Sequence, residues 1–94
     1  MPTLQIEHEV PNYEGWKKTF DSDPINRKQS GAKRYRIYRV ANDQRTVIVE
    51  LDFENMESLQ QTLQALQNLW NKVRGTFIVN PKTRILELME FQVM

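Results

Sequence analysis

The longest regular pattern in the chain runs from Asn55 to Gly75. Its apolar residues recur at every third or fourth position, which places them on one stripe of an amphipathic helix. Asn55 is suited to cap the first turn, and Gly75 is suited to end the helix because glycine tolerates the left-handed conformation. The pattern therefore predicts one long helix with a single buried face. The stripe consists of Met56, Leu59, Leu63, Leu66, Leu69, Trp70 and Val73.

Four other segments have the residue pattern of strands, and the first of them alternates strictly between apolar and polar residues. A period of two is typical of half-buried strands, and the segments are Leu4–Val10, Lys33–Ala41, Thr46–Phe53 and Thr83–Val93. With a helix after the first strand and another after the third, the order is βαββαβ. This order predicts a ferredoxin-like α+β fold, in which an antiparallel four-stranded sheet carries two main helices on one face.

A shorter helix is expected between the first two strands. Asn12 is placed to cap it, and Tyr13, Trp16 and Phe20 share one of its faces. An aspartate followed by a proline then predicts a further turn or two over Asp23–Gln29.

The charges of the two middle strands select one register. A three-residue loop between these strands sets arginines opposite carboxylates on one face and apolar residues opposite each other on the other face. A slip by one residue would set charges against aliphatic side chains. The predicted pairs are Arg36–Glu50, Arg34–Asp52, Ile37–Val49 and Tyr35–Leu51. The polar face is expected to carry Gln5, Glu7, Glu9, Arg34, Arg36, Glu50 and Asp52.

The last predicted strand, Thr83–Val93, is apolar on both faces although it lies at a sheet edge in this topology. An uncovered apolar edge promotes aggregation, so a second copy is expected to cover it. This predicts a two-fold homodimer whose two sheets pack face to face. The residues expected in that interface are Ile85, Met89, Phe91, Arg36 and Glu50.

The composition of the chain excludes or disfavours several classes of function. The 94 residues form one domain, 1–94, and a net charge of +1 predicts no strong attraction to nucleic acid or to an anionic membrane. The absence of cysteine excludes disulfides and thiolate sites, and a single histidine disfavours a metal site. No apolar run is long enough to span a membrane, and no signal-peptide pattern opens the chain, so a cytoplasmic protein is expected.

His8 is the strongest candidate for a catalytic residue. An ordinary histidine pKa near 6.5 suits proton transfer, and the strand pattern points His8 toward the helices. The alternative is that it ends the apolar face and bonds a neighbour. Likewise, Glu7, Glu9 and Glu50 are either paired catalytic carboxylates or, as the pattern favours, part of a charge ladder with the arginines.

Aromatic side chains supply a second candidate. They are placed to line a pocket for a flat apolar ligand, although aromatic residues at helical spacing are more often simply core. The pocket residues expected are Asn12, Tyr13, Trp16, Phe20, Tyr35 and Trp70.

The run HEVPNYEGWKKTFDSDP, followed by Arg27, Gly31 and the YRIYR strand, resembles a family of small bacterial proteins in the dimeric α/β-barrel superfamily, near the antibiotic-biosynthesis-monooxygenase-like families. The resemblance covers nearly the whole chain. It implies a homodimer whose two sheets form one barrel, with a pocket between the sheet and the helices of each subunit.

The wider group includes cofactor-free oxygenases of aromatic polyketides and haem-degrading oxygenases. The latter use an asparagine on strand one, a tryptophan on a helix and a later histidine. Trp70 matches the tryptophan, but strand one offers His8, and no histidine follows Trp70.

Together these features predict a homodimeric protein that binds or transforms a small, partly aromatic molecule without a cofactor. As an enzyme it would be monooxygenase-like, with His8 handling the proton. The alternative is a non-catalytic dimerisation or small-ligand-sensing module. RNA binding is disfavoured because the open face of the third strand shows Glu50 and Asp52 where bases would need to stack.

Overall fold

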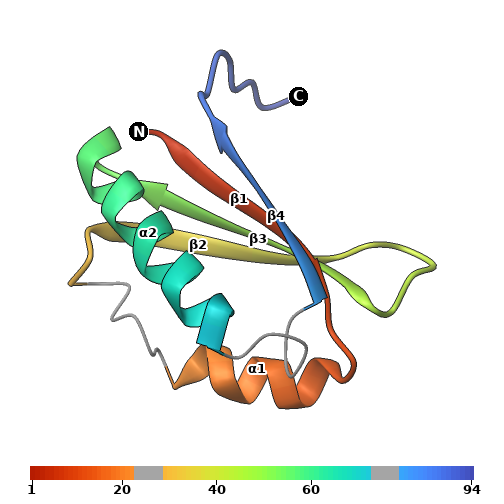
Figure 1. The fold of residues 1–94 in the computed structure, drawn as a ribbon. Coiled ribbons are helices and arrows are strands. Elements are labelled where there is room, and N and C mark those ends of the chain that lie inside the picture. The colour runs from red at the N-terminus through yellow and green to blue at the C-terminus, as the bar shows by residue number, and fades with distance from the viewer. Residues whose placement is uncertain (23–28, 73–78) are drawn as a thin grey trace.

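A computed structural model describes residues 1–22, 29–72 and 79–94 (Figure 1). The elements are β1 (Thr3–Glu9), α1 (Tyr13–Asp21), β2 (Ala32–Arg39), β3 (Thr46–Phe53), α2 (Met56–Lys72) and β4 (Val79–Leu86). Their order confirms the predicted βαββαβ arrangement. The helical turn predicted to begin at Asp23 and the predicted helix-ending Gly75 lie outside the described residues. Among the described helices, none combines the length and the apolar character needed to cross a membrane.

The four strands form one antiparallel sheet in the order β2-β3-β1-β4. Strands β1 and β3 are therefore central, and β2 and β4 are edges. Figure 1 shows α2 crossing one face of this sheet, with α1 near one end of the strands. The register between β2 and β3 is the predicted one, with all four expected pairs opposite each other: Arg36–Glu50, Arg34–Asp52, Ile37–Val49 and Tyr35–Leu51.

Asparagine caps begin both helices as the sequence predicts. The Asn12 side-chain oxygen accepts from the Gly15 amide at 2.9 Å, and the Asn55 side-chain oxygen accepts from the Ser58 amide at 2.8 Å. Each bond satisfies one of the free N–H groups of a first turn. Short helices such as α1 are marginal by themselves, so the cap and the burial of Trp16 together hold α1 in place.

The core lies between the helices and the inner face of the sheet. Alternate residues of β1 and β3 supply most of it, Trp16 comes from α1, and Leu59 and Leu66 come from the predicted stripe of α2. Leu63 and Trp70 pack partly buried against this core, whereas Met56 in the first turn remains exposed. The buried apolar residues are Leu4, Ile6, Val10, Trp16, Val47, Val49, Leu51, Phe53, Leu59 and Leu66.

The open face of the sheet is a network of charges centred on Asp52. Only 4% of Asp52 is exposed; its carboxylate accepts from the Thr3 hydroxyl at 2.6 Å, from Arg36 at 2.8 Å, and from Arg34. Hydrogen bonds from Arg36 hold the pKa of Asp52 well below its usual range. Arg36 also pairs with Glu50 at 3.1 Å. These contacts favour the charge ladder over catalytic carboxylates.

The last strand differs from the prediction at both ends. It runs from Val79 to Leu86 instead of Thr83–Val93, so residues ahead of the predicted strand, Val79 and Lys82, already pair with β1. The physical reason lies in β1, which begins at Thr3 and pairs that residue with Leu86. Beyond Leu86 no residue of β1 remains to pair with, and residues 87–94 form an exposed tail beyond the strand (Figure 1).

Two glycines provide a matched test of this architecture. Gly31 has φ +100°, and an added Cβ would lie 2.9 Å from the Ser58 side chain, so Gly31→Ala is expected to destabilise the fold by about 1 kcal/mol or more. Gly15 lies in α1 with at least 3.7 Å to the nearest atom, so Gly15→Ala is expected to stabilise it by about 0.5 kcal/mol. Urea unfolding followed by circular dichroism measures both; shifts of the same sign would contradict the described turn.

Candidate functional site

His8 lies near the end of β1, between Glu7 and Glu9. Because side chains alternate along a strand, the two glutamates face the open side of the sheet and the imidazole faces the helices. His8 is only 3% exposed, and neither ring nitrogen has a hydrogen-bond partner among the described residues. An unpaired buried polar group costs about 1–3 kcal/mol, and such groups nearly always have partners. The ring nitrogens of His8 are therefore candidates for binding a ligand group.

Aromatic rings surround His8 on the helix side. Trp16 lies 5.3 Å from the imidazole between ring centroids, and the tryptophan in turn contacts Tyr13 at 5.8 Å and Phe20 at 5.2 Å. Phe20 continues the chain of contacts to Tyr35 of β2 at 5.2 Å, edge to face. We call these five rings the aromatic row. The spacing of 13, 16 and 20 along α1 aligns three of them on one helical face.

Burial controls the protonation of His8. Loss of solvent lowers its pKa from 6.5 to about 4, because the apolar surroundings disfavour the charged imidazolium. At neutral pH the ring is therefore uncharged, with one N–H donor and one nitrogen lone pair. This is the form that a proton acceptor requires.

Two cations lie at the margin of the aromatic row. The Arg39 guanidinium lies 5.8 Å from the centre of the Tyr13 ring, and the Lys17 ammonium lies 6.0 Å from the Phe20 ring. Lys17 is also bonded to Asp21 at 2.6 Å, so its charge is already paired within α1. The charge of Arg39 lies close to the Tyr13 ring, and a cation in such a position is attracted to the electron-rich face of an aromatic ring.

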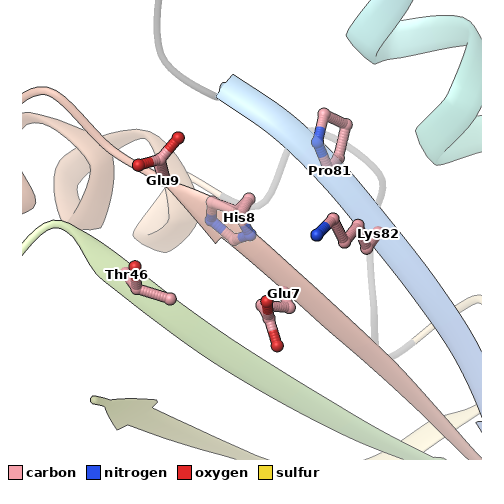
Figure 2. A pocket seen from close by; sticks show the side chains of 6 residues that line it. All are labelled: Glu7, His8, Glu9, Thr46, Pro81 and Lys82. Atoms are coloured by element: carbon pink, nitrogen blue, oxygen red, sulfur yellow. The ribbon is translucent and has the colours of Figure 1, made fainter. Parts of the chain in front are cut away.

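A hollow lies beside the end of β1, at the point where the pairing of β4 with β1 changes register. Glu7 is opposite Lys82 but Glu9 is opposite Val79, so two residues of β4 stand against His8 alone. Pro81 is one of them, and its lack of an N–H interrupts the ladder, as proline does at bulges and edge strands. The hollow has a volume of about 550 Å³, and we call it the strand-end hollow (Figure 2). It is lined by Glu7, His8, Glu9, Thr46, Pro81 and Lys82.

The structure therefore divides the predicted site residues. It brings His8 together with Tyr13, Trp16, Phe20 and Tyr35 in the aromatic row. Asn12 is placed as the cap of α1, with its oxygen bonded to the Gly15 amide. Trp70 packs on the core from α2 and has no ring contact with the row among the described residues.

Sequence reasoning missed three residues of the strand-end hollow: Thr46, Pro81 and Lys82. One signal was present. A proline next to an edge strand often marks a bulge, but the predicted strand began only at Thr83. For metals, the described part of the chain contains no group of three His, Cys, Asp or Glu side chains arranged to hold an ion.

Several solved structures are similar to this chain in fold. SnoaB of Streptomyces nogalater, a cofactor-independent oxygenase, matches with a TM-score of 0.74 and 8% identity over 96% of this chain and 94% of that one. A variant of MhuD with two manganese protoporphyrin IX molecules per active site matches with a TM-score of 0.69 and 16% identity over all of both chains. A dimeric ferredoxin-like protein from an uncultured marine organism matches with 0.66 and 13% over 97% of each.

The chain has the ferredoxin-like fold of these proteins. Structures described as antibiotic biosynthesis monooxygenases, one of them a putative enzyme from Nitrosomonas europaea, are also among the matches. The resemblance seen in the sequence is thus confirmed at the level of fold. No protein-family model matches the chain, and no curated protein matches it either.

The lowered pKa of His8 makes stability depend on pH in a defined window. The unfolded chain takes up a proton near pH 6.5 and the folded chain only near pH 4, so acidification between these values favours unfolding. The full shift corresponds to about 3 kcal/mol. The contribution of uncharged His8 to the free energy of unfolding is fully present above pH 6.5. It decreases as the pH falls from 6.5 to 4 and does not change further below pH 4.

Replacing His8 with leucine removes this titration. Urea unfolding at pH 7.5 and pH 4.5 is expected to show a smaller loss of stability for His8→Leu than for the natural chain. The carboxylates contribute equally to both chains and cancel in the comparison. An equal loss in the two chains would mean that His8 is solvated in the folded protein.

Proposed function

We propose that this protein is a homodimer that binds a small, partly aromatic molecule and oxidises it without a cofactor, with His8 as the proton acceptor. The observation that carries the proposal is the buried, uncharged imidazole of His8, which has no partner among the described residues and lies beside Trp16. A base held neutral by burial is of little use to the fold itself, because its nitrogens add nothing to packing. A substrate hydroxyl or acidic C–H group would provide the missing partner.

The neighbouring structures support the same chemistry. SnoaB is described as a cofactor-independent oxygenase, and MhuD is described with flat porphyrins in its active site. Both share this fold with the present chain. A flat ligand also suits the aromatic row, since ring faces and edges attract other aromatic rings.

The proposed reaction needs only the substrate and dioxygen. His8 accepts a proton from an activated CH₂ group flanked by aromatic rings, which leaves a carbanion delocalised over those rings. The carbanion transfers electrons to dioxygen, one oxygen atom becomes a new C=O group, and the other leaves as water with the two hydrogens. The substrate is oxidised by two electron pairs as O₂ is reduced, so no separate reductant enters. Arg39, beside Tyr13, is positioned to favour the negative charge of the intermediate.

A specific observation favours a non-catalytic alternative. The rings of the aromatic row lie 5.2–5.8 Å apart, which is close enough to fill the space between them. A row that remains closed would serve as core, and the protein would then act as a dimerisation or small-ligand-sensing module. The test below separates the two functions because oxidation and binding are measured independently.

A hydroxylated anthrone is a suitable probe, since its central CH₂ becomes a C=O on oxidation. The natural protein is expected to accelerate oxygen uptake by this probe, and His8→Ala to lower the rate by about 100-fold, the usual range for loss of a general base. Oxygen consumption and quenching of tryptophan fluorescence give turnover and binding. Binding without oxygen uptake would favour the ligand-sensing module.

Thr62→Val is the matched control. Thr62 is another buried side chain whose polar atom has no partner among the described residues, but it lies on α2, outside the aromatic row. Removing its hydroxyl should leave the oxidation rate unchanged. A natural protein with neither binding nor oxygen uptake, or a His8→Ala variant with the full rate, would overturn the proposed function.

The homodimer rests on the exposed tail. Leu88, Met89, Phe91 and Val93 are 70%, 87%, 78% and 80% exposed, and they follow directly on an edge strand. So large an apolar surface on a small domain favours association. Arg36 and Glu50 on the open face would complete the interface, where their pair at 3.1 Å would be further shielded from water. The dimeric neighbour of the same fold supports this assembly.

Charges placed in the tail test the dimer. Met89→Glu combined with Phe91→Glu is expected to convert the dimer into monomer at micromolar concentration, because two carboxylates cannot be buried in an apolar contact without large cost. Gln60→Glu with Gln67→Glu adds the same charges on exposed positions of α2 and should leave the dimer intact. Native mass spectrometry reads the assembly. An unchanged dimer in the tail variant, or a natural chain that is monomeric, would contradict the proposed interface.

A further inference from the structure

The strand-end hollow opens on the open face of the sheet, and the proposed oxidation does not use its charged side chains. Four of its lining side chains share that face: Glu7 and Glu9 by alternation along β1, and Thr46 and Lys82 as their cross-strand partners. His8 also lines the hollow, and its ring lies 5.3 Å from that of Trp16. The hollow and the aromatic row therefore share His8 and differ in all their other residues.

Some of the polar side chains that line the hollow have partners and others do not. Glu7 is paired with Arg84 at 3.5 Å, and the Thr46 hydroxyl donates to Asp43 at 2.6 Å. Glu9 and Lys82 have no ion-pair partner among the described residues, and they do not pair with each other although both line the same hollow. Figure 2 shows the Lys82 side chain extending from β4 toward β1. Within the described residues, one carboxylate and one ammonium without an ion-pair partner thus line the same hollow.

This combination selects one class of ligand. A simple anion would be attracted by Lys82 but repelled by Glu9, and a simple cation the reverse. A metal ion is disfavoured because the described residues hold no group of three suitable side chains. A molecule with an anionic group and a cationic group at its two ends satisfies both charges. The volume of about 550 Å³ suits a small organic molecule rather than a single ion.

The backbone explains why a hollow exists here. Where β4 bulges, it places one extra residue opposite His8, and Pro81 provides no N–H to the ladder with β1. Bulges of this kind commonly re-aim side chains next to functional sites. Here the bulge leaves Lys82 on one side of the gap and Glu9 on the other.

We propose that the strand-end hollow is a second binding site, for a small zwitterion of the amino-acid type. Lys82 binds the carboxylate of the ligand, and Glu9 binds its ammonium group. The two charged groups that would bind the ligand, Glu9 and Lys82, have no part in the proposed oxidation, so one activity can be absent while the other is present.

Three related probes test the charge requirement. Leucine carries both charges, N-acetyl-leucine only the negative one, and leucinamide only the positive one. Leucine is expected to bind the natural protein most tightly and to shift the backbone amide signals of Glu7, Glu9, Thr46 and Lys82 in nitrogen-15 correlation spectra. Titration of each probe gives its Kd.

Two variants assign the two ends of the ligand. Lys82→Gln is expected to weaken leucine binding by roughly fivefold, the effect of one exposed ion pair, and to bring leucine to the affinity of leucinamide. Glu9→Gln should weaken it by roughly the same factor and bring leucine to the affinity of N-acetyl-leucine. Lys72→Gln and Glu57→Gln, on α2, are the matched controls and should change nothing.

The outcomes separate the two sites. Retained leucine binding in His8→Leu, together with lost oxidation, supports two independent sites. Equal affinity for all three probes, no saturable binding of any probe, or signal changes confined to other parts of the chain would overturn the zwitterion site. None of these results depends on whether the anthrone is oxidised.

Discussion

The register of β1 is the constraint on which the rest of the structure depends. This strand lies between β3 and β4, so each of its residues is held from both sides. A slip by one position would exchange the two faces, placing Leu4 and Ile6 in solvent and Glu7 and Glu9 in the core. The cost of burying two carboxylates is far above the stability of a domain of this size. The faces of the sheet are therefore determined by one alternating sequence.

The same register places a histidine at an inward position of β1, where an aliphatic residue would pack better. His8 occupies an inward position of β1, and the surrounding rings hold it neutral by excluding water. Its two nitrogens lose their hydration without gaining a partner within the described residues. A leucine there would avoid that cost. A fold that tolerates a local disadvantage of this kind usually does so at a functional position.

Much of the fold was predictable because its signals are local. The caps at Asn12 and Asn55, the stripe of α2 and the charge pairs of the β2–β3 hairpin each follow from nearby residues. The end of β4 was not predictable in this way. Residues after Leu86 are apolar enough to continue a strand, but pairing stops because β1 starts at Thr3. Strand length depends on the partner as well as on the segment's own pattern.

The candidate site likewise has one part that the local sequence predicts and one part that depends on strands far apart in the chain. His8 and the rings of α1 could be placed from period alone, whereas the strand-end hollow arises from a mismatch between two strands far apart in the chain. Its position has a consequence for both proposals. Glu7, His8 and Glu9 are consecutive, so one short segment presents a neutral base to the helix side and two carboxylates to the open side.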